Sequence, residues 1–259
     1  MRRCRQCDCS RAYKLADGRF KCKGCGHRYT WITAWDASRL SDATKRRLLE
    51  LFVLGVPVYR QRFRTEASIP SVQRFYRLVR ACCASVEELR EPFDGTIECD
   101  ETTIGGARHG KRGWGAAGKI IVLGILQRNG QVKVFAVPAR EGKRIIGLVR
   151  THTRPGSLYY TDDWQAYGSL RVQGDHVVIR KERGRPKGRD HINGIEGFWS
   201  YAKNWLYPIR GVPRKHVHLF LGEICYRFNH RSEDLFPLLY KLLRSTGMSE
   251  INPILVRFR

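Results

Sequence analysis

The sequence predicts a multidomain α/β protein with a small cysteine-rich unit, a helical segment and a mixed-sheet domain, in that order. Three observations support this prediction. Two C-x-x-C pairs lie near the start, helical apolar spacing fills residues 36–83, and strand-like and helix-like patterns alternate after residue 92. A chain of 259 residues is long enough for one large domain with smaller appendages. We therefore predict four segments, namely 1–33, 34–92, 93–232 and 233–259.

The composition narrows the class of partner. Lys and Arg number 48 against 24 Asp and Glu, which gives a formal charge of +24 and favours a polyanion. A hydrophobic content of 42% supplies enough apolar surface for folding and argues against general disorder. No apolar run approaches the length of a membrane span, and the N-terminus lacks a signal-peptide pattern. We expect an intracellular protein without a membrane partner.

The first segment carries the pairs Cys4/Cys7 and Cys22/Cys25, separated by 14 residues. Four thiolates at this spacing can surround a structural Zn²⁺ tetrahedrally, whereas a redox C-x-x-C needs only one pair within a βαβ unit. Cys9 is a spare thiol that could exchange with Cys7. The spacing predicts a zinc ribbon over residues 1–33, with too little core to fold without metal.

The second segment, 34–92, carries three helical patterns, SDATKRRLLELFVLG, VPVYRQRF and IPSVQRFYRLVRACC. Arg74, Arg77 and Arg80 recur every three residues on the last pattern, which is typical of a recognition helix in a helix-turn-helix. The alternative is an ordinary helical linker with a solvated basic face. The neighbouring zinc ribbon favours DNA, and we predict backbone contacts from Arg74 and Arg77.

The third segment begins after Glu91-Pro92 and alternates strands with helices. Hairpin-like turns join its first three strands, and helices separate the later ones, which predicts a mixed sheet. A helix follows the third strand, and two more helices and a helical tail complete the chain. The predicted strands are TIECDET, KIIVLGILQ, QVKVFAVPA, SLYYTDD and HVVIRK, and the predicted helices cover 142–152, the stretch HINGIEGFWSYAK and 215–230.

A basic stretch, RKERGRPKGR, covers residues 180–189. It holds six basic residues, one acid and loop-forming Gly and Pro. Basic loops contact phosphates rather than base edges, so sequence specificity is expected from the N-terminal segments. The predicted DNA contacts in this stretch are Arg180, Arg183, Arg185, Lys187 and Arg189.

Three acids occupy positions where they can converge. Asp100 and Asp162 each end a predicted strand, and Glu196 arrives on the helix HINGIEGFWSYAK. Converging carboxylates repel one another unless cations compensate them, and two Mg²⁺ or Mn²⁺ ions suit such oxygen ligands. The alternative for each single acid is a helix cap or a surface pair. Asp163, for example, is interpreted as the N-cap of the turn at 164–167.

Several long motifs resemble those of one known family. GKRGWGAAGK, YYTDDWQAY, HINGIEGFWSYAK and CYRFNHR are similar to motifs in DDE-type transposases of Merlin-related bacterial insertion sequences, the insertion-sequence-1595 family. The resemblance covers the ribbon, ECDETTIGG and the chain to about Arg231. It implies a ribonuclease H-like catalytic domain at 93–232, with DNA strand cutting and joining that depend on divalent metal.

The resemblance assigns the acids to Asp100, Asp162 and Glu196. It leaves the third ligand open, because some members carry Asn there and Asn193 lies one helical turn before Glu196. Lys203 matches a trailing basic residue and is expected to contact phosphate near the cut site. The implied partners are double-stranded DNA, both terminal repeats and target, and further copies of the chain in a homodimer or larger assembly. The implied location is the bacterial cytoplasm, in association with the nucleoid.

Three functions follow from these observations. The first is an active transposase, which the complete set of acids favours because a pure binder has no need for mutually repelling carboxylates. The second is a catalytically silent, transposase-derived DNA-binding protein. The third is a structure-specific nuclease of the same fold, which would cut DNA without joining it.

Overall fold

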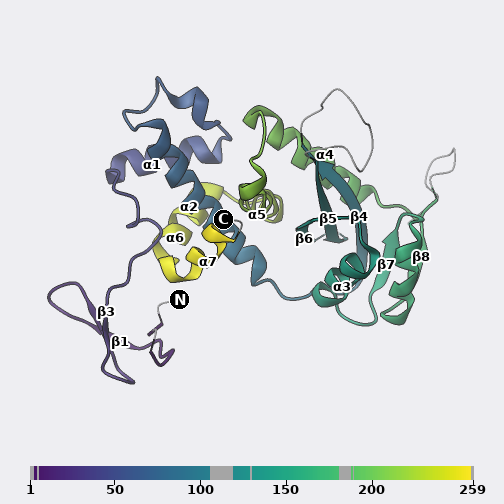
Figure 1. Cartoon of the computed structure of the whole chain (residues 1–259), viewed down its shortest axis with the longest axis horizontal. Coiled ribbons are helices and arrows are strands. Elements are labelled where there is room, and N and C mark those ends of the chain that lie inside the picture. Colours follow the sequence, from purple (N-terminus) through teal and green to yellow (C-terminus); the bar gives the residue numbers. More distant parts are fainter. Residues whose placement is uncertain are drawn as a thin grey trace. The chain divides into compact units, whose positions relative to one another are not determined.

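The computed structural model describes residues 3–4, 6–105, 119–128, 130–180, 188 and 190–257. The chain is a mixed α/β protein that divides into two compact units (Figure 1). One unit combines Met1–Ser85 with Glu233–Arg259, and the other comprises Val86–Ser232. Within the described ranges, no helix has both the length and the apolar character that a bilayer crossing requires.

The cysteine-rich segment forms a small antiparallel sheet of β1 (Ala12–Lys14), β2 (Phe20–Cys22) and β3 (Arg28–Tyr29). Gly18, with a φ of +80°, lies in the turn between β1 and β2, where a side chain would strain the backbone. The buried core beneath these strands is very small and consists of Cys4, Phe20, Cys22 and Tyr29. Apolar burial alone therefore stabilises this sheet weakly.

The helical segment contains α1 (Asp42–Val53), η1 (Val58–Gln61) and α2 (Ile69–Glu88). The Ser41 hydroxyl caps α1 by accepting from the backbone N–H of Thr44 at 3.1 Å. The middle pattern, expected to be helical, forms only the four-residue 3₁₀ turn η1. Pro57 precedes this turn, and so short a segment cannot offset the cost of nucleating an α-helix.

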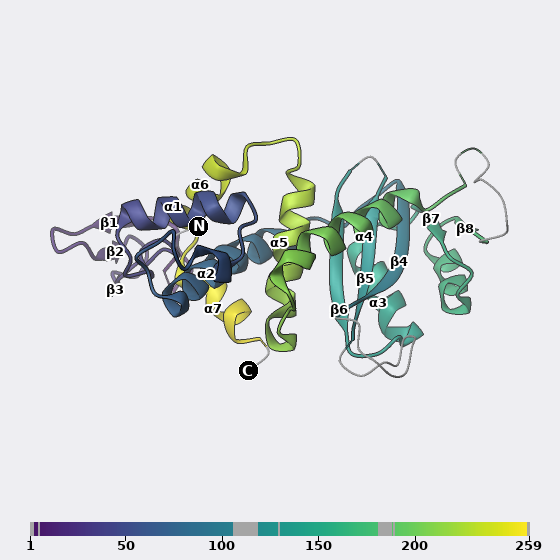
Figure 2. The same cartoon turned by 90° about the horizontal axis from the view of Figure 1, so that it is seen from above.

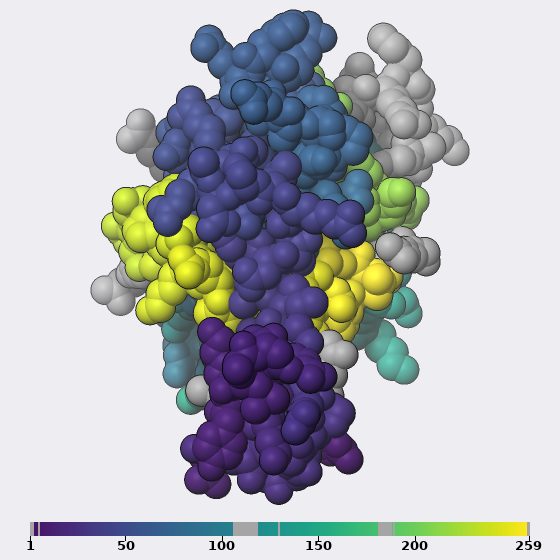
Figure 3. Space-filling model, turned by 90° about the vertical axis from the view of Figure 1, so that its left-hand side faces the viewer, coloured from purple at the N-terminus to yellow at the C-terminus, as the bar shows by residue number. Residues whose placement is uncertain are grey.

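The C-terminal helices α6 (Leu235–Ser245) and α7 (Met248–Val256) belong to the same unit as the N-terminal segment. The backbone N–H of Ala34 donates to Thr246 O, and that of Met248 donates to Ile32 O, both at 2.9 Å. Figure 3 shows the yellow C-terminal residues on both sides of the indigo residues between β3 and α1. The two ends of the chain thus build one helical unit together.

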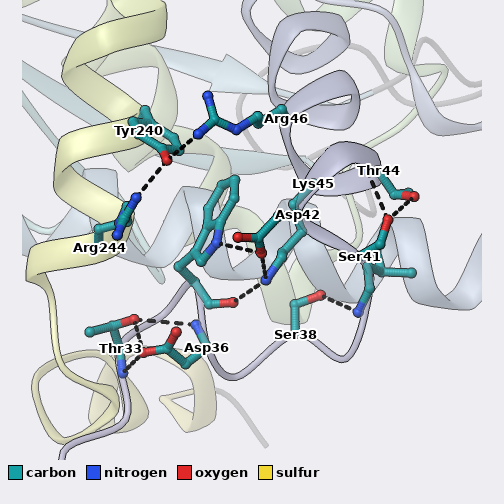
Figure 4. A network of polar contacts seen from close by, with 12 residues as sticks. Thr33, Asp36, Ser38, Ser41, Asp42, Thr44, Lys45, Arg46, Tyr240 and Arg244 are labelled. Carbon is teal, nitrogen blue, oxygen red and sulfur yellow. Dashed lines mark hydrogen bonds and ion pairs between the residues drawn. The ribbon is translucent and has the colours of Figure 1, made fainter.

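Side chains reinforce this junction, as Figure 4 shows. The Tyr240 hydroxyl on α6 accepts from the guanidinium groups of Arg46 on α1, at 2.7 Å, and Arg244, at 2.6 Å. The buried Lys45 ammonium donates to Trp35 O at 3.3 Å and lies 2.8 Å from the carboxylate of Asp42. Residues almost two hundred positions apart in the sequence are therefore connected by direct hydrogen bonds.

The second unit is built on a five-stranded mixed sheet in the order β6-β5-β4-β7-β8 (Figure 2). β4, β5 and β6 pair antiparallel, whereas β7 is parallel to β4 and β8 is parallel to β7. β4 is therefore the central strand and has neighbours of both kinds. The strands are β4 (Thr96–Ile104), β5 (Ile120–Gln127), β6 (Val132–Val137), β7 (Leu158–Thr161) and β8 (His176–Val178).

Helices cover both faces of this sheet. The side chains of Ile97 and Cys99 pack on the face that holds α3 (Gly142–His152) and η2 (Gln165–Val172). Those of Ile104 and Val122 pack on the other face, with α4 (Asn193–Leu206) and α5 (Val217–Asn229). Two 3₁₀ turns, η3 (Tyr207–Ile209) and η4 (Arg214–His216), connect α4 to α5. Alternation along β4 thus directs successive side chains to opposite helical layers.

The motif CYRFNHR lies at the end of α5 and contacts the edge of the sheet. The Asn229 amide, at the end of α5, pairs with the backbone of Val132 on β6, accepting at 2.8 Å and donating at 3.0 Å. Arg227 forms a buried ion pair with Glu223, with an Nε–Oε1 distance of 2.9 Å. Asn229 therefore fixes α5 against the antiparallel edge of the sheet, whereas the Glu223–Arg227 pair lies within α5.

Candidate active site and metal sites

Asp100 lies near the middle of β4, opposite Gly124 of β5, on the face covered by α4. The buried Trp199 of α4 donates its indole N–H to Asp100 Oδ2 at 3.1 Å. Gly124 makes room for this indole, because a Cβ there would lie only 2.6 Å from Trp199 Cζ2. The carboxylate of Asp100 is thus held in a fixed position beside α4. Trp199 is a core residue of the layer between the sheet and α4.

Asp162 directly follows β7, whose last residue, Thr161, pairs in parallel with Cys99 of β4. This register brings Asp162 beside Asp100, so the two acids meet as the sequence predicted. The expectation that Asp100 ends its strand was wrong, because β4 keeps pairing with β5 as far as Ile104. Asp162 Oδ1 accepts from the backbone N–H of Trp164 at 3.1 Å. The expectation that Asp163 caps this turn was wrong, because the side chain of Asp162, and not that of Asp163, accepts the hydrogen bond from the first residue of the turn.

Glu101 is the third acid that the structure brings to this position. Ligand oxygens of Asp100, Glu101 and Asp162 all lie within 4.8 Å of one another, which suits a hard divalent cation. The pairing of β7 with β4 ends at Cys99, so from Asp100 onward β4 has no neighbouring strand on that side within the described residues. Side chains from both faces of the sheet can meet at this open edge. Glu101 is a site residue that sequence reasoning missed.

Glu101 differs from the two aspartates in its surroundings. Its side chain is fully buried; Oε1 accepts from the Tyr167 hydroxyl at 2.8 Å, and Oε2 accepts from Arg140 at 3.1 Å. Burial raises the pKa of Glu101 above its ordinary value, and the Tyr167 and Arg140 contacts oppose that rise. The Arg140 guanidinium also lies 3.5 Å from Asp162 Oδ2 and stacks 4.1 Å from the Trp164 ring. Arg140 therefore links Glu101 to Asp162 and partly compensates the charge of the cluster.

Glu196 was predicted to be the third acid of the cluster. Among the described residues, the acids whose oxygens lie within 4.8 Å of one another are Asp100, Glu101 and Asp162, and Glu196 is not one of them. Glu196 and Asn193 are both exposed on the first turn of α4. Glu196 lies three residues before Trp199, and Lys203 lies four residues after it, so all three share one side of the helix. Because Trp199 contacts Asp100, this side of α4 faces the acid cluster.

The four predicted zinc ligands come together. The Sγ atoms of Cys4, Cys7, Cys22 and Cys25 all lie within 4.8 Å of one another, as a tetrahedral thiolate site requires. The pKa of Cys22 is lowered to about 6, because the backbone N–H groups of Cys25 and Gly24 donate to its sulfur. Cys9 is outside this group and has its sulfur 3.7 Å from Arg11 O. The cluster can therefore hold zinc with the ligand set that the spacing predicted.

The predicted DNA contacts are placed only in part. Arg74 and Arg77 are exposed on α2, whereas Arg80 is half-buried with its guanidinium 5.6 Å from the rings of Phe52 and Tyr76. Arg180 is exposed shortly after β8. The remaining predicted contacts lie outside the described residues, namely Arg183, Arg185, Lys187 and Arg189.

Comparison with known proteins identifies the family. The model of the ISXO2-like transposase domain matches residues 92–229, which contain the whole acid cluster. The chain belongs to the ISXO2-like transposase family. This agrees with the resemblance seen in the sequence motifs.

Two relatives of this transposase are consistent with the assignment. An uncharacterized transposase-like protein of Haemophilus influenzae is 32% identical over 101 residues, which cover 39% of this chain and 82% of the relative. An uncharacterized protein in transposable element ISH50 of Halobacterium salinarum is 24% identical over 234 residues, which cover 83% of this chain and 74% of the relative.

Proposed function

We propose that the chain is an active DDE-type transposase that binds the ends of an insertion sequence, cuts the DNA there and joins it to target DNA. The observation that carries the proposal is the meeting of Asp100, within β4, and Asp162, directly after the adjacent strand β7, inside the matched transposase domain. A formal charge of +24 supports a DNA partner.

The fold supports this assignment. We infer that residues 93–232 form a ribonuclease H-like catalytic domain. A mixed five-stranded sheet with helices on both faces is compatible with that fold. Residues 1–33 are proposed to form a zinc ribbon that holds one structural Zn²⁺, and residues 34–92 a helix-turn-helix-like DNA-binding segment. The C-terminal helices of residues 233–259 are proposed to complete that segment, since they share its compact unit.

We assign the third acidic role to Glu196 rather than Glu101. Both oxygens of Glu101 already accept hydrogen bonds, from Tyr167 and Arg140, inside a fully buried pocket. Glu196 is exposed one turn before Trp199 and so can reorient toward Asp100. Asn193 could also reach this position, but its amide oxygen carries no charge to balance a cation.

Carboxylate oxygens at this site fit Mg²⁺ or Mn²⁺, and two such ions would supply an activated water and stabilise the leaving oxygen of the phosphodiester. Asp100 lies beside Asp162 and contacts α4, the helix that carries Glu196. We propose that Asp100 would serve both ions, with Asp162 and Glu196 each serving one. Lys203 is proposed to hold a phosphate beside the cut through its compact, exposed ammonium group. The 3′-hydroxyl released by the first cut then attacks a target phosphodiester in line, so one P–O bond forms as another breaks.

Backbone contacts to DNA are assigned to the exposed Arg74, Arg77 and Arg180 and to the predicted basic residues after β8. Two element ends must be brought together for joining, so we propose a homodimer or larger assembly on DNA. We propose that the protein acts in the cytoplasm, at the nucleoid, because its proposed substrate is DNA.

The test is strand cleavage and strand transfer on labelled DNA that carries the element's own ends, with Mg²⁺ or Mn²⁺. Asp100→Ala and Glu196→Ala should each lose cleavage and joining by at least about 10³-fold, equivalent to ~4 kcal/mol of transition-state stabilisation. Asn193→Ala should retain both reactions. DNA binding should survive in all three variants, because the acids do not contribute attraction to phosphate.

Three outcomes would change the proposal. Tight binding of the ends without cleavage under either metal would favour a silent DNA-binding protein. Cleavage without joining would favour a structure-specific nuclease. Loss of activity in Asn193→Ala with retention in Glu196→Ala would move the third role to Asn193.

A further inference from the structure

A second buried acid on β4 contacts the start of α4. Glu98 lies two residues before Asp100 and therefore on the same face of the strand, and its side chain is fully buried. Its Oε2 accepts from the backbone N–H of Ile195 at 2.9 Å. Ile195 is the third residue of α4, so this N–H has no partner within the helix, and a carboxylate at a helix N-terminus is electrostatically favourable.

Arg128 completes the contact from the end of β5. Its Nε donates to Glu98 Oε1 at 2.8 Å, and its Nη2 donates to the carbonyl of His191 at 2.6 Å. The guanidinium also lies 4.2 Å from the Tyr160 ring, and the backbone N–H of Arg128 donates to Thr96 O at 2.9 Å. Arg128 thus binds both the buried acid and His191, which lies two residues before the start of α4.

Gly194 is needed for this close approach. A Cβ at Gly194 would lie 2.8 Å from Glu98 Oε2 and 3.1 Å from Leu126 Cδ2, so the helix would have to move away from the sheet. The contact explains why ECDET carries an acid at Glu98 and why HINGIEG carries a glycine just before Ile195. Two motifs distant in sequence meet here, yet neither Glu98 nor Gly194 has a role in the acid cluster.

We propose that Glu98 and Arg128 are positioning residues that fix the first turn of α4 on β4 and so set the distance from Glu196 to Asp100. This rests on the proposed function of Glu196. The first anchor point, Ile195, immediately precedes Glu196, and the second, Trp199, follows it by three residues and binds Asp100 itself. Glu196 is thereby held between two contacts to the strand that carries Asp100.

Glu98 is a buried charge whose partners determine its contribution to stability. The Glu98 carboxylate has a cationic partner in Arg128 and a backbone donor in Ile195, so its burial is compensated at both oxygens. Removing either of these contacts would allow the first turn of α4 to shift slightly relative to β4. Misplacement of a reacting group by about 1 Å can cost on the order of 10²-fold in rate.

The experiment compares Glu98→Gln and Gly194→Ala with the native full-length chain in two readouts. The first is Mn²⁺ binding, followed by the electron paramagnetic resonance signal of free Mn²⁺, with Asp100→Ala as the reference that lacks the site. The second is the Mg²⁺ concentration for half-maximal cleavage of end DNA. Both variants should bind Mn²⁺ about tenfold more weakly and need about tenfold more Mg²⁺, a shift that corresponds to ~1.4 kcal/mol.

Glu223→Gln is the matched control. Glu223 forms a comparable buried pair with Arg227, at 2.9 Å with side-chain exposures of 4% and 3%, but both residues lie on α5. The control should lose stability in a denaturant titration while its metal dependence stays native. If it shifts metal dependence as much as Glu98→Gln does, stability alone explains the effect and the proposal is overturned.

The outcomes separate this inference from the function on which it rests. Native metal dependence in both Glu98→Gln and Gly194→Ala overturns the positioning role and leaves the transposase intact. If the native chain binds Mn²⁺ through Asp100 but does not cleave DNA, the enzymatic proposal is overturned. Mn²⁺ binding by the two variants then still tests the positioning role. Absence of any Asp100-dependent Mn²⁺ binding and of cleavage overturns both.

Discussion

The cysteine cluster and the carboxylate cluster are both able to hold metal, but they differ in how much structure surrounds them. The cysteine cluster has a buried core of four residues, and two of these, Cys4 and Cys22, belong to the group of four cysteines that could hold the metal. The carboxylate cluster is built on the central strand of a five-stranded sheet with hydrophobic cores on both faces.

This difference separates two uses of a metal. Where the ligands make up half of the core, metal binding supplies the free energy that orders the segment. Where hydrophobic packing already fixes the strands, the ligands are held in place before the metal arrives, and the ion is free to act on substrate. We therefore expect zinc loss to unfold the ribbon and loss of the divalent ion to stop chemistry while the sheet stays folded.

The largest expected effect is that of Cys22→Ser. Zinc content should fall from one per chain to none, and the residues around β1–β3 should lose structure, because structural zinc contributes about 10–16 kcal/mol in zinc-finger peptides. Metal analysis and amide hydrogen exchange would show both changes. Exchange in β4 and β5 should stay native.

Cys9→Ser is the control for that variant. Cys9 lies in the same short segment but outside the group of four sulfurs, so its zinc content and exchange should match the native chain. Zinc loss from Cys9→Ser would show that Cys9 is a ligand. Protected amides around β1–β3 in zinc-free Cys22→Ser would contradict the view that the metal orders this segment.

A smaller effect is expected where the sheet positions an acid. Trp199→Phe removes the 3.1 Å indole hydrogen bond to Asp100 and keeps most of the buried ring. A hydrogen bond to a charged group is worth about 1.5–3 kcal/mol, so cleavage of end DNA should fall by roughly tenfold or more, with the fold retained.

Trp205→Phe is the matched change on the same helix, because the Trp205 indole donates to Glu223 at 3.4 Å, away from the acid cluster. Cleavage by Trp205→Phe should stay within about twofold of native. Equal losses in the two variants would mean that general packing of α4, rather than the bond to Asp100, controls activity.

The sequence predicted which four cysteines come together because these residues are close in the chain. Cys4 to Cys25 lie within one short segment, and their spacing alone defines the tetrahedral set. The meeting of Asp100 and Asp162 was also predictable from the two apolar strand patterns that carry them. Only Asp162 follows the end of its strand, whereas Asp100 lies within β4. The helix expected at 142–152 appears with those bounds as α3, because its apolar positions repeat at helical spacing.

Glu101 was not predictable by the same reasoning. Alternation along a strand places Glu101 on the face opposite Asp100, which argues against their meeting. Only the register shows that β7 ends opposite Cys99 and leaves the edge of β4 open beyond it. The pairing of α6 and α7 with the N-terminal segment depends on contacts such as Ala34 to Thr246, and no local pattern in the sequence encodes them.

The smallest expected effect concerns pH and again separates the two units. His152 lies at the end of α3, stacked 4.5 Å from Phe135 and with Nδ1 3.5 Å from the Lys133 ammonium. Burial, and then the charge of Lys133, lowers the pKa of His152 below its usual 6.5. The unfolded chain therefore takes up this proton first, so the contribution of His152 to stability is complete above about pH 6.5 and is lost as the pH falls through the folded pKa.

His152→Gln removes this titration, and the free energy of unfolding of the sheet unit should then depend less on pH below 6.5. Because the ring is partly exposed, the change should be only roughly a few tenths of a kcal/mol. Hydrogen exchange of the β4 and β5 amides at several pH values would measure it. Acid acts on the ribbon through protonation of its thiolates, so exchange around β1–β3 should follow the same pH curve in His152→Gln as in the native chain. If the substitution shifted the pH curves of β1–β3 and of β4 and β5 equally, the stabilities of the two units would be coupled. That result would contradict the view that metal orders the cysteine-rich segment while hydrophobic packing alone stabilises the sheet.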